Sequence, residues 1–231
     1  LTFITLLKIP APYGKFSKTN WGPMIPSKLG WIVMEIISPI ALLYFFLKGN
    51  IEITTTNMTF ITLWSLHYFN RSVIYPLRQN NPAKMPLLIA ILAFLFNVVN
   101  GYINGTHLGS IQAYSIDYMS NWNFIVGVCL FITGAYINIK SDNILLSLRS
   151  KSGEYKVPEG FMFKYVSFPN YLGEILEWMA FAIMTWSLAG LSFMIWTMAN
   201  LVPRAIKGHQ WYQSKFESYP KDRKAIFPFI I

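Results

Sequence analysis

The chain has 231 residues, of which 54% are hydrophobic and only 13% are charged, and its mean hydropathy is +0.39. Soluble domains carry about 25% charged residues, so this composition excludes an ordinary soluble domain and indicates a membrane protein. A net charge of +9 would suit nucleic acid, but the basic residues gather between apolar runs, which is typical of cytoplasmic loops. We therefore expect a lipid bilayer as a partner, and no nucleic acid.

Apolar runs predict seven membrane spans. The segment 1–9 is apolar and stops at Pro10, and we interpret it as the end of a first helix that is truncated at its N-terminus. The longest polar stretch, 140–169, is expected to be a loop, and a polar tail begins at Arg204. The predicted fold is all-α, a polytopic membrane bundle of seven transmembrane helices in a single domain, 1–231. The other six spans are expected at about 29–47, 58–75, 85–103, 121–139, 170–187 and 191–202.

The basic residues alternate between the two sides of these spans. Of the 19 Lys and Arg residues, only Lys48 lies away from the tail, the loops after spans one, three and five, and the span ends that border those loops. The positive-inside rule then places the C-terminus and the 140–169 loop in the cytoplasm. We expect a multi-pass protein of a bacterial inner membrane or the endoplasmic reticulum, and we find no internal repeat of the kind seen in transporters.

Polar side chains occur within the spans or near their ends. An ionisable group inside a membrane is costly and normally marks a functional site. Most of these groups fall toward the basic side, so we expect a polar pocket that opens to the cytoplasm. Nearby Lys and Arg would suit an anionic ligand. The polar residues are Glu35, His67, Tyr68, Arg71, Asn97, Asn100, Asn138, Asp142, Asn170, Glu174 and Glu177.

Some of these residues have simpler interpretations. Asn97 and Asn100 are interpreted as hydrogen-bonding partners between helices rather than as site residues. His67 can be structural or catalytic, and Glu177, three residues after Glu174 on the same helical face, can be a site residue or a partner between helices. The three histidines are too scattered for a metal site, so no metal is expected.

The motifs of this chain, taken together, resemble the steroid 5α-reductase family, and we expect a bacterial or other non-vertebrate member. Two N-terminal motifs and five C-terminal motifs carry the resemblance, which extends over nearly the whole chain. The motifs are 12–15 (PYGK), 67–69 (HYF), 137–142 (INIKSD), 170–178 (NYLGEILEW), 185–187 (TWS), 209–212 (HQWY) and 216–229 (FESYPKDRKAIFPF).

The resemblance implies a seven-helix membrane enzyme that uses NADPH to reduce the Δ4 double bond of a 3-oxo steroid. Glu35 and Tyr68 match the pair that polarises the substrate ketone, and Trp31 matches an aromatic residue of the steroid pocket. The residues that match the family's NADPH pocket are Asn138, Asp142, Arg149, Tyr155, Lys156, Asn170, Glu174, His209, Tyr212 and Arg223.

The chain departs from the family pattern at three points. Asn70 stands where the family often has His, Lys156 stands where Arg is common, and the first helix is incomplete. Lysine lacks the planar fork with which arginine binds phosphate at two points. The phosphate contact expected at Lys156 is therefore weaker than the one that arginine would make.

The chemistry agrees with these assignments. Hydride transfer to C5 builds negative charge on the ketone oxygen, and a hydrogen-bond donor at that oxygen stabilises the transition state. The Tyr68 hydroxyl, held by Glu35, is the expected donor, while Asn170 and Glu174 are expected to hold the nicotinamide carboxamide.

Other functions stay open from the sequence. A related reductase of polyprenyl, sterol or enoyl lipids would have a similar apolar pocket. A methyltransferase of the isoprenylcysteine type would use S-adenosylmethionine, and a transporter or ligand-binding membrane protein would keep only the polar cavity. We expect a monomer that binds a steroid or another apolar enone.

Overall fold

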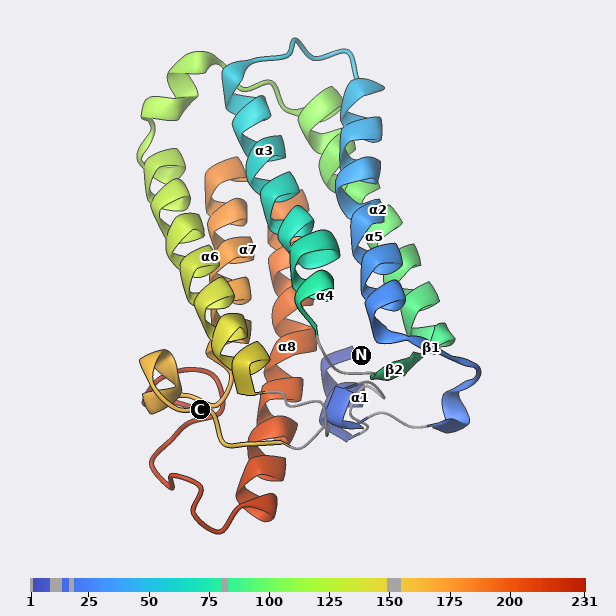
Figure 1. The fold of residues 1–231 in the computed structure, drawn as a ribbon. Helices are drawn as coiled ribbons and strands as arrows, with labels where there is room; N and C mark the ends of the chain where they lie inside the picture. Colours follow the sequence, from blue (N-terminus) through green and yellow to red (C-terminus); the bar gives the residue numbers. More distant parts are fainter. Residues whose placement is uncertain (1, 9–13, 17–18, 80–82, 149–154) are drawn as a thin grey trace.

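The computed structural model describes all residues except 1, 9–13, 17–18, 80–82 and 149–154. The described residues are mostly helical, which confirms the helical class of the predicted fold, and Figure 1 shows the long helices side by side in one bundle. The main elements are α1 (Thr2–Lys8), β1 (Met24–Pro26), α2 (Ser27–Leu47), α3 (Thr55–Phe69), a π-helical turn (Asn70–Ile74), α4 (Tyr75–Arg78), β2 (Lys84–Pro86), α5 (Leu87–Thr106), a second π-helical turn (His107–Ile111), α6 (Trp122–Leu148), α7 (Pro169–Thr185) and α8 (Leu188–Lys215). Short 3-10 turns lie at Gly14–Phe16, Thr19–Trp21, Ile116–Ser120 and Phe161–Lys164.

Three of the described helical segments are long and apolar enough to cross a membrane, and they are Ser27–Leu47, Leu87–Ile111 and Trp122–Leu148. They correspond to the second, fourth and fifth expected spans. Large apolar side chains such as Ile40, Leu95 and Ile132 are exposed on their outer faces. Extended apolar surface of this kind marks contact with a partner or a lipid phase, so these helices support an integral membrane protein.

Two helices are longer than predicted. α6 continues to Leu148, so the start of the expected 140–169 loop is helical, and α8 continues to Lys215 within the expected polar tail. The tail of α8 is polar in composition, but it buries Ala205, Gly208 and Tyr212 along one side. The loop prediction was wrong in these two places because a helix needs only one apolar stripe to pack against its neighbours.

A small β-sheet joins the N-terminal ends of α2 and α5, and the sequence did not predict it. β1 pairs antiparallel with β2, with Ile25 opposite Met85. The amide of Ser27 donates to the Ala83 carbonyl at 2.9 Å, and the amide of Leu87 donates to the Pro23 carbonyl at 2.8 Å. The residue before β2 thus satisfies the first N–H group of α2, and the residue before β1 satisfies the first N–H group of α5. The two helices therefore begin in a fixed register.

α6 and α7 approach closely at two glycines. A Cβ atom added to Gly173 would lie 2.5 Å from the Asn138 nitrogen and 2.6 Å from the Gly134 oxygen, both in the main chain of α6. Small residues allow helix backbones to approach in this way in membranes. The contact brings Asn138 of α6 next to Asn170 of α7, and the Asn138 amide donates to the Asn170 carbonyl at 2.9 Å.

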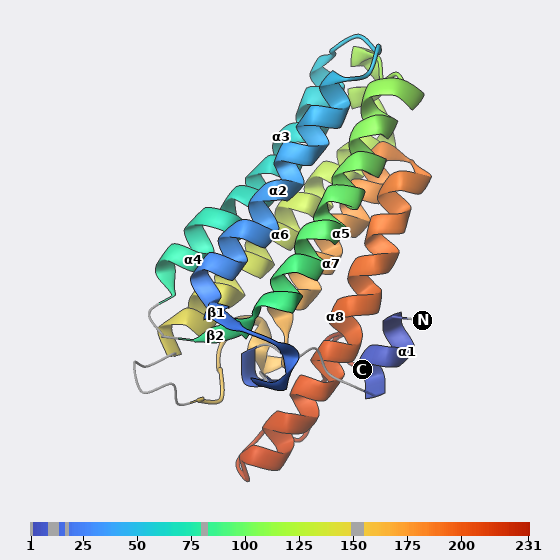
Figure 2. The same cartoon turned by 90° about the vertical axis from the view of Figure 1, so that its right-hand side faces the viewer.

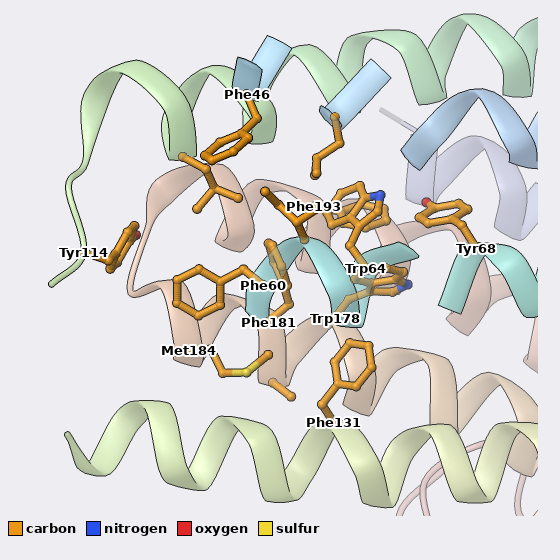
Figure 3. Close-up of a cluster of buried hydrophobic side chains, with 14 of the residues drawn as sticks. Phe46, Phe60, Trp64, Tyr68, Tyr114, Phe131, Trp178, Phe181, Met184 and Phe193 are labelled. Atoms are coloured by element: carbon orange, nitrogen blue, oxygen red, sulfur yellow. The ribbon is translucent and has the colours of Figure 1, made fainter. Parts of the chain in front are cut away.

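A buried aromatic cluster fills the bundle between α3, α7 and α8. Figure 3 shows Tyr114 at one end of the cluster and Tyr68 at the other, with Trp64 and Trp178 next to Tyr68. The ring centres of Trp64 and Trp178 are 5.0 Å apart. Such aromatic pairs add about 0.5–1.5 kcal/mol each beyond their buried area, so the cluster holds the Tyr68 ring firmly in place.

The N-terminal helix α1 packs against α8. Figures 1 and 2 both show α1 beside the C-terminal part of α8, and the two helices are in contact. This part of α8 also extends past the ends of the neighbouring helices in Figure 2. Its side chains Arg204 and Tyr212 line the cavity described next.

Candidate active site

A cavity of about 460 Å³ lies between the helices, within the usual size range of small-molecule sites. Its walls come from all eight described α-helices, with contributions from the π-helical turn Asn70–Ile74 and from β2. Part of the lining is apolar or aromatic, as at Phe96, Phe193 and Trp196, and part consists of charged and amide side chains. The cavity therefore suits a ligand or a pair of ligands with both apolar and polar parts.

Arg71 forms a buried charge centre on the cavity wall. Its Nη1 atom lies 3.2 Å from Asp142 Oδ2, and its Nη2 atom lies 4.0 Å from Glu174 Oε2. The guanidinium group stacks over the rings of Trp31 and Tyr75 at 4.7 and 5.0 Å. A buried arginine needs such partners to offset its lost hydration, and here they come from α2, α4, α6 and α7.

A π-helical turn sets the position of Arg71. The turn Asn70–Ile74 follows α3 directly and leads into α4. π-Helical turns widen a helix by one residue and occur often at functional sites. Here the turn carries Arg71 to the cavity only three residues after Tyr68, so both side chains reach the same cavity.

An amide from α7 extends this network. The Asn170 Nδ2 atom donates to Asp142 Oδ1 at 3.0 Å. Its Oδ1 atom is buried and has no hydrogen-bond partner among the residues that the structure describes. A buried acceptor without a donor costs about 1–3 kcal/mol. Because Asn170 lines the cavity, a ligand with an N–H group would satisfy this oxygen.

Glu35 and Tyr68 face the same cavity from α2 and α3. The Tyr68 hydroxyl donates to Asn97 Oδ1 at 3.3 Å, and Asn97 Nδ2 donates to the carbonyl of Met34, the residue before Glu35, at 2.6 Å. Asn97 of α5 therefore joins Tyr68 to the part of α2 that carries Glu35. A phenol hydroxyl and a carboxyl group on one cavity wall can present a hydrogen bond to a ligand carbonyl.

His67 and Glu177 form a separate buried pair. His67 Nδ1 lies 2.8 Å from Glu177 Oε2, and both side chains are almost fully buried. The His67 ring packs against Trp178 with 4.6 Å between ring centres. Neither residue is among those that line the cavity, so the geometry favours the structural interpretation of both.

Most of the predicted site residues that the structure describes meet at the cavity. They come from segments far apart in the sequence, and the cavity also holds the expected steroid-pocket aromatic. The predicted residues that line it are Trp31, Glu35, Tyr68, Asp142, Tyr155, Asn170, Glu174 and Tyr212.

Four predicted residues lie off the cavity wall. Asn138 supports Asn170 from behind, and Lys156 is exposed. His209 Nδ1 is 2.6 Å from the Ser167 hydroxyl, and the buried Arg223 donates to the Pro158 carbonyl at 3.1 Å. The last predicted residue, Arg149, lies outside the described residues.

Three cavity residues had no individual site assignment in the sequence prediction. Arg71 was only one of the polar residues near span ends, Asn97 was interpreted as a partner between helices, and Arg204 was counted only among the basic residues around the pocket that would suit an anionic ligand. A periodic signal existed for Arg204, because Arg204 and Tyr212 are eight residues apart and share one face of a helix. The Arg204 Nε atom donates to the Tyr171 hydroxyl at 2.8 Å.

Comparisons with known proteins cover almost the whole chain. A family model described as 3-oxo-5-alpha-steroid 4-dehydrogenase matches residues 83–231. Steroid 5-alpha-reductase DET2 of Arabidopsis thaliana is 42% identical over 99% of this chain and 91% of the relative. The proteins named 3-oxo-5-alpha-steroid 4-dehydrogenase 1 from Rattus norvegicus and Homo sapiens are each 36% identical, over 100% and 94% of this chain and 90% and 85% of the relatives.

Proposed function

Because this chain belongs to the steroid 5-alpha-reductase family, whose members are oxidoreductases acting on CH–CH groups, we propose that it reduces the Δ4 double bond of a 3-oxo steroid with NADPH. The observation that carries this proposal is the convergence of Glu35, Tyr68, Asn170 and Glu174 on one cavity. These residues come from three helices. The same cavity therefore holds Glu35 and Tyr68, which are expected at the ketone, and Asn170 and Glu174, which are expected at the nicotinamide.

The ketone end of the reaction is assigned to Glu35 and Tyr68. The Tyr68 hydroxyl donates a hydrogen bond to the ketone oxygen, where negative charge develops as the enone accepts a hydride. Asn97, which accepts from the Tyr68 hydroxyl and donates to the Met34 carbonyl next to Glu35, keeps this donor beside the Glu35 carboxyl group. Trp31 and the other aromatic side chains of the cavity contact the apolar steroid body and exclude water.

The cofactor end is assigned to α6, α7 and α8. NADPH, when bound, supplies the hydride. The free Oδ1 atom of Asn170 fits a carboxamide N–H group, and Glu174 lies on the same cavity wall. Tyr155, Tyr212 and Arg204 also line the cavity, and the arginine matches the anionic charge of a dinucleotide.

For the remaining assigned residues we propose supporting roles around the cofactor. Asn138 fixes the Asn170 backbone, and Asp142 fixes its side-chain amide. We keep Arg149, Lys156, His209 and Arg223 as NADPH residues on the strength of the family pattern.

We further propose the seven-span topology with a cytoplasmic C-terminus and a pocket that opens to the cytoplasm, in a monomeric protein. The continuous helical segment from Thr55 to Arg78, the 17-residue α7 and the 28-residue α8 supply spans beyond the three described above. The distribution of Lys and Arg supports the orientation.

The proposal is tested with the purified, detergent-solubilised protein. It is incubated with testosterone or progesterone and with NADPH or NADH, and the products are separated by chromatography. We expect a 5α-reduced steroid that depends on NADPH. Failure to reduce any 3-oxo-Δ4 steroid, together with turnover of a polyprenyl or enoyl lipid, would replace the steroid by a lipid substrate.

A further inference from the structure

Asn97 occupies the point where α2, α3 and α5 meet at the cavity. Its side chain is buried and yet lines the cavity. Its Oδ1 atom accepts from the Tyr68 hydroxyl at 3.3 Å, and its Nδ2 atom donates to the Met34 carbonyl at 2.6 Å. Glu35, the next residue of α2, lines the same cavity. One side chain therefore binds the phenol that we assign to the ketone and ties it to the α2 backbone next to Glu35.

The orientation of this amide follows from its partners. The Met34 carbonyl only accepts hydrogen bonds, so the nitrogen of Asn97 faces α2 and the oxygen faces Tyr68. A residue that merely joined two helices would not need to face the cavity. The next asparagine on the same side, Asn100, differs from Asn97: it is buried, accepts from Asn104 of the same helix through its Oδ1 atom, and is not among the cavity-lining residues.

We propose that Asn97 is a positioning residue for the reduction, which aims the Tyr68 hydroxyl into the cavity, toward the place of the substrate ketone. This inference rests on the proposed function. Before substrate binds, the Asn97 oxygen accepts the hydrogen bond of the phenol, and the ketone oxygen then takes its place as acceptor.

The size of the effect follows from the role. Removing a complete oxyanion donor costs about 10²–10³-fold in kcat. Removing the support of that donor leaves the phenol in the cavity but lets its hydroxyl rotate freely, so part of the preorganisation is lost. We expect Asn97→Leu, which fills a similar volume, to lower kcat by about tenfold and to change KM by less than about threefold.

A double-mutant cycle separates this role from a structural one. Asn97→Leu is combined with Tyr68→Phe, and Asn100→Leu is the matched control on the same helix. If Asn97 acts through the phenol, its substitution costs less than about twofold in the Tyr68→Phe background, because the coupled group is already gone. Asn100→Leu leaves kcat within about twofold of the parent in both backgrounds.

A second readout does not depend on turnover. The infrared difference between the parent and Tyr68→Phe isolates the C–O band of the Tyr68 phenol, and this band shifts in Asn97→Leu but not in Asn100→Leu. Asn97→Ser, too short to reach the phenol, replaces Asn97→Leu if the leucine variant does not fold. An equal loss of kcat in both backgrounds, or an unshifted phenol band, overturns the inference. If the parent protein reduces no 3-oxo-Δ4 steroid, the proposed function is overturned instead. The phenol band still tests whether Asn97 binds the Tyr68 hydroxyl.

Discussion

Tyr68 lies where the buried aromatic cluster meets the cavity, and this position suits the donor role that we propose for it. Its ring packs against Trp64 and Trp178 with ring centres 5.6 and 5.7 Å apart, so the ring itself is held by dense packing. Its hydroxyl, in contrast, reaches the cavity wall and meets Asn97. The aromatic ring is therefore held rigidly, while the hydroxyl group can reach a ligand in the cavity.

The Tyr68→Phe variant keeps the ring and removes only the donor. We expect kcat to fall by about 100-fold or more, while NADPH affinity changes by less than about twofold, because the assigned cofactor residues are on other helices. Steady-state kinetics and cofactor titration measure the two effects. Tyr102→Phe, which removes an exposed phenol from α5, is the control. A Tyr68→Phe rate within about threefold of the parent would remove the donor role.

Glu177 is better explained by its partner than by the cofactor. Glu177→Ala leaves the buried His67 ring without its hydrogen bond. Since the ring can become neutral, the cost resembles that of an unsatisfied buried polar group, about 1–3 kcal/mol, rather than that of a buried charge. We expect a lower melting temperature in detergent and near-normal cofactor affinity per folded molecule.

Two comparisons sharpen this prediction. Glu177→Gln keeps a hydrogen-bonding group next to His67 and should lose less stability than Glu177→Ala. Glu217→Ala removes an exposed carboxylate and should leave the melting temperature unchanged. Equal melting temperatures for Glu177→Ala and Glu217→Ala would show that the buried pair adds nothing to stability.

At the level of single residues, the sequence predicted which residues line the cavity better than it predicted which neighbours they contact. Glu35 and Glu174 were recognised because a carboxylate inside a span demands a reason. The sequence could not tell that Arg71 pairs with Asp142, or that Asn97 faces the cavity as well as α2, because a polar residue in a span looks the same whether it bonds to a neighbouring helix or lines a site. Only the three-dimensional contacts separate these cases.

The contact between α6 and α7 is the element-level feature on which the cofactor end depends. Gly173→Ala adds one methyl group where only backbone atoms of α6 lie within 3 Å. The helices must separate, so we expect a loss of about 1–3 kcal/mol in stability and weaker NADPH binding, because Asn138 and Asp142 of α6 support Asn170 of α7. Thermal unfolding and cofactor titration measure the two effects.

The control for this variant is Ile132→Val on the exposed side of α6, which changes the helix by one methyl group without touching α7. The prediction fails if Gly173→Ala binds NADPH as tightly as the parent and as Ile132→Val.

Helices and strands could be predicted from the sequence where a long apolar run marks them. α2, α5 and α6 follow from long apolar runs. The β1–β2 pair did not, because three-residue strands carry too little alternation to be recognised. The helical ends of α6 and α8 were missed because their polar composition concealed one buried side, which Ala205, Gly208 and Tyr212 form in α8.

For the whole molecule, the orientation in the membrane is the open prediction, and cysteine labelling can test it. In a background with Cys129→Ser, the exposed positions Glu52 and Ser218 are replaced separately by cysteine. In intact cells or sealed vesicles with the native orientation, a membrane-impermeant maleimide should label Glu52→Cys directly, and Ser218→Cys only after lysis. Labelling of both positions from the same side would contradict a cytoplasmic C-terminus or an odd number of spans between the two.

The β1–β2 pair also has a consequence for the order of events during synthesis. Met34 and Asn97 are 63 residues apart, and at roughly 5–20 residues per second the ribosome needs about 3–13 seconds to reach the second after the first. α2 therefore enters the bilayer with Glu35 before Asn97, which lines the same cavity, has been made. Pairing of β2 with the β1 segment already made brings α5 to α2 from the first turn onward, which shortens the time that this carboxyl group spends without the polar neighbours of the cavity.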